Sequence, residues 1–76
     1  MKGEHADLIG ALFAVASAKL ESAHQASVDG QGHELRAADI GAYATAVTKQ
    51  ANDAVALVAA AVIIIDDDVG ELGCNP

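Results

Sequence analysis

Apolar residues in the second half of the chain recur at alternating spacings of four and three residues, and this repeat constrains the fold more than any other feature. The repeat consists of Ile40, Ala44, Val47, Ala51, Ala54, Val58, Ala61 and Ile65. Such spacing places side chains along one stripe of an α-helix. The stripe mixes bulky residues with alanine, which suits close packing against another helix. We therefore predict a helix from about residue 34 to residue 66.

The first half of the chain carries a shorter stripe with the same spacing. This stripe consists of Ile9, Phe13, Ala16, Leu20 and Ala23, and it predicts a helix from about residue 4 to residue 28. Between the stripes, residues 29–33 combine two glycines with polar neighbours, as in a tight loop that needs positive φ. Asp39 is a candidate N-cap if the second helix restarts after a kink near residue 36. We predict an all-α, antiparallel helical hairpin that forms one domain over residues 1–76, with an acidic flexible tail at residues 67–76.

The isoleucine-rich end of the second predicted helix indicates that the hairpin pairs with another copy. If residues 28 and 34 flank the loop, Glu4 lies opposite about Val58, and residues 59–65 have no partner in the first helix. Three consecutive isoleucines spread over about 200° of a helix, more than one neighbour covers. Their burial is worth on the order of several kcal/mol, comparable to the whole stability of a small domain.

We therefore predict a homo-oligomer, with a dimer that forms a four-helix bundle as the favoured state. The predicted oligomer interface consists of Val58, Ala61, Val62, Ile63, Ile64 and Ile65. A strand over residues 55–65 is the alternative, because this segment ends in β-branched residues. The preceding alanines and the lack of a second strand favour the helix.

The charge distribution argues against nucleic-acid and membrane partners. The chain of 76 residues has a net charge of −7, and its four basic residues are scattered. Binding to nucleic acid or to an anionic membrane surface needs clustered lysine and arginine. The longest apolar run, residues 54–65, spans about 18 Å as a helix, whereas the bilayer core is roughly 30 Å thick. We expect neither a nucleic acid nor a membrane as partner.

The N-terminal residues and the cysteine usage predict a cytoplasmic protein. Residues 1–7 are polar and show no signal-peptide pattern. Cys74 is the only cysteine, so no disulfide within one chain is possible. A single thiol suits a reducing compartment. The role of Cys74 itself is left open.

Few residues are arranged for chemistry. Glu21 and His24 form a Glu-x-x-His pair, as in di-metal helical bundles, but few inward-facing carboxylates accompany it. Residues 66–68 are three aspartates without the glycine and terminal glutamate of a calcium-binding loop. The serines wind around the first helix and do not converge on a histidine. We expect no catalytic residues, no metal site and no cofactor, and therefore no enzyme.

The leading functional interpretation is a non-enzymatic, oligomeric helical-bundle protein that mediates protein–protein interaction. One alternative is a metal-binding helical bundle that uses Glu21 and His24 from two subunits. The other is a small acidic regulator or inhibitor that presents residues 66–76 to a basic protein surface.

Overall fold

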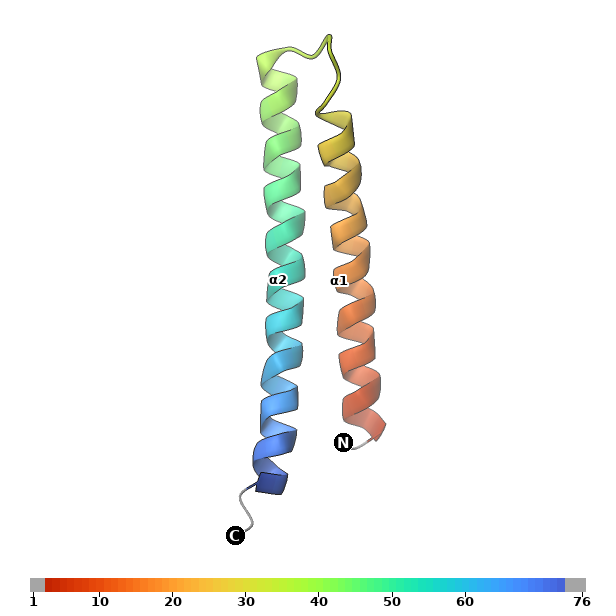
Figure 1. Ribbon diagram of the computed structural model, residues 1–76, viewed down its shortest axis with the longest axis vertical. Coiled ribbons are helices and arrows are strands. Elements are labelled where there is room, and N and C mark those ends of the chain that lie inside the picture. Colours follow the sequence, from red (N-terminus) through yellow and green to blue (C-terminus); the bar gives the residue numbers. More distant parts are fainter. Residues whose placement is uncertain (1–2, 74–76) are drawn as a thin grey trace.

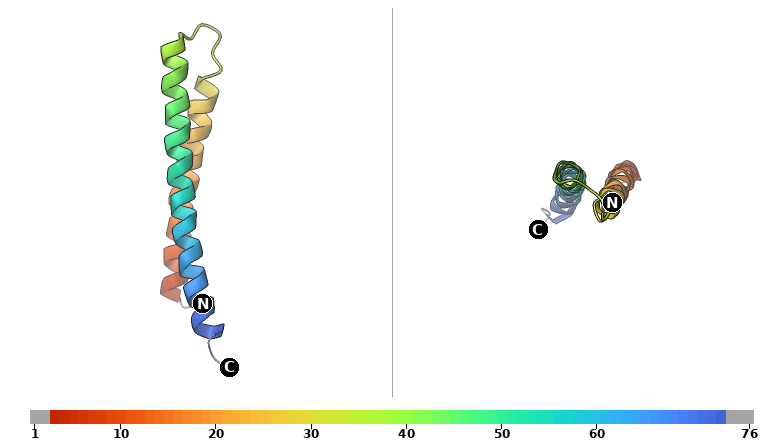
Figure 2. Two further views of the ribbon diagram at one scale, coloured as in Figure 1. Left: turned by 90° about the vertical axis from the view of Figure 1, so that its left-hand side faces the viewer. Right: turned by 90° about the horizontal axis from the view of Figure 1, so that it is seen from above.

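The protein folds into an all-α helical hairpin (Figure 1). The computed structural model describes the backbone of residues 3–73 and the side chains of residues 3–68. Helix α1 (Gly3–Asp29) and helix α2 (Ala37–Gly73) run antiparallel and are joined by a loop at residues 30–36. Seen from above, the two helices form a single layer (Figure 2). The predicted hairpin is confirmed, and the alternative strand over residues 55–65 is wrong, because this segment lies inside α2.

The contact between α1 and α2, here called the inner seam, is built mainly from alanine. Its buried apolar residues are Ile9, Ala16 and Ala23 on α1, and Ala54 and Ala61 on α2. Within each helix they are seven residues apart, so they follow one continuous line along the hairpin. Small side chains let the two backbones approach closely, and they leave little volume for large residues between them. Phe13 and Leu20 accordingly remain 48% and 54% exposed, at the edge of the seam.

Three pairs of facing residues fix the register of the hairpin: His5 with Asp68, Lys19 with Asp53, and Gly30 with Tyr43. In each pair the residue numbers add to 72 or 73. The predicted register, with Glu4 opposite Val58, is therefore wrong by about three turns. Residues 59–65 do not overhang as expected, because they pack against the first turns of α1, and Ala61 is 0% exposed.

The longer loop explains this shift. The loop occupies residues 30–36, and it rises along the hairpin axis before α2 begins (Figure 1). The second helix therefore starts at Ala37 and not near residue 34. Inside its first turn, the Asp39 carboxylate accepts a hydrogen bond of 3.3 Å from the Arg36 backbone N–H. Asp39 thus provides a hydrogen-bond acceptor for a free backbone N–H at the start of α2, as the acidic residue of a capping box does. It lies inside the helix and is not the N-cap itself.

The loop glycines have a different role from the one predicted. No glycine in the described part of the chain has positive φ. A Cβ atom added to Gly30 would lie 3.4 Å from the Cβ of Tyr43. This is an ordinary van der Waals distance, so the contact shows that Gly30 lies beside Tyr43 at the loop end.

Helix α2 continues to Gly73, beyond the predicted end at residue 66. The carboxylate of Asp68 is buried and lies 3.2 Å from Nδ1 of His5. Asp68 also faces the N-terminal end of α1, where a helix dipole favours negative charge. This contact offsets the unfavourable position of an aspartate near the end of its own helix. His5 is consequently half-buried.

Candidate interaction surface

A second four-three repeat runs along one broad side of the hairpin, and we call it the outer seam. On α1 it consists of Ala6, Gly10, Phe13, Ser17, Leu20, His24 and Ser27, and on α2 of Ala44, Thr48, Ala51, Val55, Val58, Val62 and Ile65. Helical geometry turns this line about 100° away from the inner seam on each helix. In an antiparallel pair, both lines turn toward the same broad side. The outer seam contains no aspartate, glutamate, lysine or arginine.

An apolar groove lies on the outer seam where Leu20 meets α2. Its lining consists of Leu20, Ala51, Ala54, Val55, Val58, Ala59 and Val62, and its volume is about 460 Å³. Every lining side chain is aliphatic. Val55 is 67% exposed, and Val62 is also largely exposed, so the groove is open to solvent in a single hairpin.

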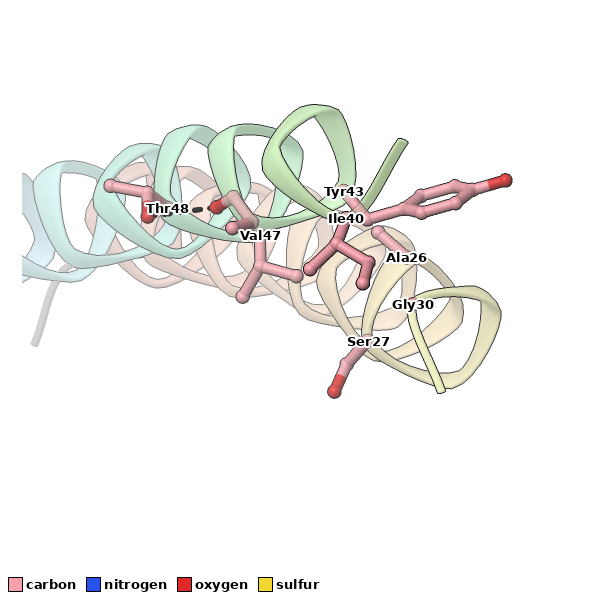
Figure 3. A pocket seen from close by; sticks show the side chains of 8 residues that line it. Ala26, Ser27, Gly30, Ile40, Tyr43, Val47 and Thr48 are labelled. Atoms are coloured by element: carbon pink, nitrogen blue, oxygen red, sulfur yellow. Dashed lines mark hydrogen bonds between the residues drawn. The ribbon is translucent and has the colours of Figure 1, made fainter. Parts of the chain in front are cut away.

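A second depression on the same side, here called the loop-end hollow, lies nearer to the loop (Figure 3). Its lining consists of Ala26, Ser27, Gly30, Ile40, Tyr43, Ala44, Val47 and Thr48, and its volume is about 370 Å³. The Thr48 hydroxyl donates a hydrogen bond of 3.0 Å to the Ala44 carbonyl, so its polar atom is satisfied within α2. Figure 3 shows that the ring of Tyr43 points away from Ile40 and Val47. The hollow is therefore shallow, uncharged and bordered mostly by small residues.

The other side of the inner seam is charged. The Asp53 carboxylate accepts a hydrogen bond of 2.8 Å from Nζ of Lys49, and Nζ of Lys19 lies 3.6 Å from the same oxygen. The hydrogen bond from Lys49 lowers the pKa of Asp53, and the positive charge of Lys19 lowers it further. Lys19 thus links α1 to α2. This side also exposes Leu8, Val15 and Ile63, so the two broad sides of the hairpin differ in charge and not in the presence of apolar residues.

The structure divides the predicted interface residues among three places. Val58, Val62 and Ile65 lie on the outer seam. Ala61 is covered by α1 within one chain, and Ile64 is half-buried at the inner seam. Ile63 is 68% exposed and points about 100° beyond Val62, away from the apolar groove.

The predicted interface left out four large residues of this side: Phe13, Leu20, Val55 and Ile40. Each of them is about half exposed or more. The signal was present, because the outer-seam positions carry no aspartate, glutamate, lysine or arginine over about three heptads of each helix. Hydrophobicity alone does not reveal this pattern. It becomes visible when the charged residues are located along each line of a helix.

The Glu-x-x-His pair gains no further ligand from the fold. Glu21 and His24 are both exposed on α1. Among the described residues, no group of three or more histidine, cysteine, aspartate or glutamate side chains is placed to hold a metal ion.

One segment of α2, Ala37–Asp68, is long and apolar enough to cross a membrane by length and composition, with a mean hydropathy of 1.4 over 18 residues. A single helix of this kind is weak evidence, because the main helix of a soluble bundle meets the same criterion. Lys49 and Asp53 lie near the middle of the segment, and a bilayer core disfavours charges there.

No family model matches the chain, and no curated protein or solved structure matches it either. The functional assignment therefore depends on the geometry and chemistry of the outer seam.

Proposed function

We propose that this chain is a non-enzymatic interaction protein that forms a homodimer, in which two hairpins pack through their outer seams into a four-helix bundle. The observation that carries the proposal is the outer seam itself, a line without aspartate, glutamate, lysine or arginine on both helices. It is wholly apolar over residues 51–65 of α2, and on α1 it combines Phe13 and Leu20 with small residues, two serines and a histidine. A helix in a two-helix contact needs one apolar line, whereas a helix in a bundle adds a flanking line for its second neighbour. Both α1 and α2 have this second line.

The angle between the two seams supports a bundle partner. Each helix has its inner seam about 100° from its outer seam, close to the right angle between neighbours in a square of four helices. A second pair of antiparallel helices, placed on the outer seam, would give both α1 and α2 a second neighbour at this angle. A second copy of the hairpin is such a pair, and pairing through the same surface on both copies gives a closed dimer.

The size of the surface also fits a dimer. From His5 to Gly30, the paired part of α1 rises about 38 Å at 1.5 Å per residue. The Cα atoms of the hairpin extend 18 Å across its broad side. The product is roughly 700 Å² in projection, near the ~800 Å² per partner of a standard protein interface.

Charge supports self-association through this side in particular. The chain has a net charge of −7, so two copies repel each other wherever their acidic residues meet. The outer seam lacks acidic and basic residues, and two copies that meet there bring no like charges into contact. The charged side with Asp53 would remain in solvent.

Two substitutions on α2, at positions whose side chains are equally exposed in the single hairpin, test the proposal. Val55 is 67% exposed on the outer seam, and Ile63 is 68% exposed away from it. Val55→Lys places a charge in the proposed interface of both copies, and each desolvated ammonium costs at least about 1–3 kcal/mol. We expect dimerisation to weaken by at least about 30-fold. Ile63→Lys should leave it unchanged.

Sedimentation velocity combined with light scattering over a range of concentrations measures the effect. The wild-type chain of 7.6 kDa should sediment as a dimer at micromolar concentration. Val55→Lys should be a helical monomer under the same conditions, with its fold checked by circular dichroism. A monomeric wild-type protein, or a Val55→Lys variant that dimerises as well as Ile63→Lys, would refute the proposal.

A further inference from the structure

His24 is the only titratable side chain on the outer seam. The other members of this line are aliphatic residues, serines, one threonine, one phenylalanine and one glycine. An imidazole changes its charge between pH 5 and pH 8, whereas carboxylates and amines keep theirs over most of this range. In the single hairpin His24 is exposed, so water solvates either form. The charge of the outer seam is therefore set by pH at this one residue.

We infer that His24 makes the dimer sensitive to pH, so that two hairpins associate while this imidazole is neutral and separate when acid protonates it. This inference rests on the proposed dimer and assigns its regulation. A second hairpin on the outer seam removes His24 from water. A neutral imidazole then needs one acceptor for its N–H, which the hydroxyl groups of the seam offer. A protonated imidazole needs a counter-charge, and the seam has none.

The neighbours of His24 within its own hairpin supply little compensation for a buried charge. On α1, Glu21 lies one turn before His24, outside the outer seam, and is exposed. An exposed pair of this kind shifts an equilibrium by only about twofold. On α2, the register places the neutral Thr48 at the level of His24. Lys49 follows it on the charged side of the hairpin, where its ammonium donates a hydrogen bond of 2.8 Å to Asp53.

The second hairpin supplies no counter-charge within its outer seam, whichever ends of the two copies meet. With both loops at one end, His24 lies at the level of the partner subunit's Thr48. With loops at opposite ends and full overlap, His24 lies near the partner subunit's Gly10 and the partner subunit's Phe13. The carboxylate beside that part of the seam belongs to the partner subunit's Asp7, which is exposed and lies outside the seam. The inferred pH response is therefore the same in both orientations.

The net charge of the chain predicts the opposite response to acid. With neutral histidines the chain has a net charge of −7, and protonation of its three histidines brings this to −4. Two hairpins then repel each other less, so the long-range electrostatic effect strengthens the dimer in mild acid. Burial of His24 weakens it. The sign of the pH effect therefore separates a specific role of His24 from a general effect of charge.

Sedimentation velocity at about pH 8 and about pH 5.5, at one ionic strength, measures the effect. An ordinary histidine is about nine-tenths protonated at pH 5.5, so keeping one neutral for burial weakens binding about tenfold. Each dimer buries two, and we expect its Kd to rise by at least about tenfold in acid. Circular dichroism at both pH values checks that the hairpin stays helical. A dimer that is equally strong or stronger at pH 5.5 refutes the inference but not the dimer, whereas a monomer at pH 8 refutes the proposed function and the inference with it.

Substitutions of the three histidines identify the residue responsible. His24→Gln keeps a neutral polar side chain at both pH values, so its dimer should be as strong at pH 5.5 as at pH 8, or stronger. His33→Gln in the loop and His5→Gln at the open end are the matched controls, because both residues lie off the outer seam, and they should keep the wild-type response. His24→Lys carries a charge at both pH values and should be as weak at pH 8 as the wild type is at pH 5.5. A His24→Gln dimer that still weakens tenfold in acid would contradict the inference.

Discussion

The close approach of α1 and α2 predicts that Ala61 does not tolerate a larger residue. Ala61 is 0% exposed, and the register places it at the level of Leu12 on α1. Ala61→Leu adds three carbon atoms at a fully buried position between the helices. Overpacking of this kind costs about 1–3 kcal/mol. A chain of this length has a total stability of roughly 4–11 kcal/mol, so the loss is a large fraction.

Urea unfolding followed by circular dichroism measures this loss. With a slope of about 1 kcal/mol per molar urea, the midpoint should fall by about 1–3 M. Ala56→Leu is the control, because Ala56 is exposed on the same helix and leucine is almost as good a helix former as alanine. It should change stability by less than about 0.5 kcal/mol. All variants are compared at one protein concentration, since association shifts the midpoint. An unchanged midpoint for Ala61→Leu, or equal losses for both variants, would show that the helices do not meet through alanine at this level.

Three further predictions concern single residues of α2. Oε1 of Gln50 is buried without a hydrogen-bond partner, so Gln50→Leu should raise thermal stability by about 1–2 kcal/mol, and a loss would contradict the packing at the inner seam. A Cβ atom at Gly41 would meet nothing within 4 Å, so Gly41→Ala should raise the free energy of unfolding by about 0.5–1 kcal/mol, as measured by urea unfolding. The folded pKa of Asp53 lies below its ordinary value, so its contribution to stability is complete above the unfolded pKa and is lost as pH falls through the folded pKa. The difference in unfolding midpoint between wild type and Asp53→Asn should therefore shrink as the pH falls below about 4 and disappear once the pH is below the folded pKa, and a difference that grows in acid would contradict the role of Lys49.

The sequence was sufficient for the hairpin but not for its register. Four-three spacing on both sides of a glycine-containing segment determines two helices and a reversal between them. A slide of seven residues leaves that spacing intact, so hydrophobic pattern alone cannot choose among registers. The choice is made by contacts between residues distant in sequence, such as His5 with Asp68 and Lys19 with Asp53. These polar pairs carry no periodic signal.

The stripe predicted on α2 contains residues of both seams. Val47, Ala54 and Ala61 of that stripe face α1, whereas Ala44, Ala51, Val58 and Ile65 continue the outer seam. The centre of the stripe is consequently turned about 50° away from α1. In an isolated helical pair, the centre of the apolar arc points at the single partner, because only that direction excludes water. A helix with two neighbours needs an apolar arc whose centre lies between the directions of those neighbours. In a square bundle, the centre of that arc points at the common core. The rotation of the apolar arc relative to the observed contact is thus an argument for a second neighbour that depends on neither the length of α2 nor its isoleucines.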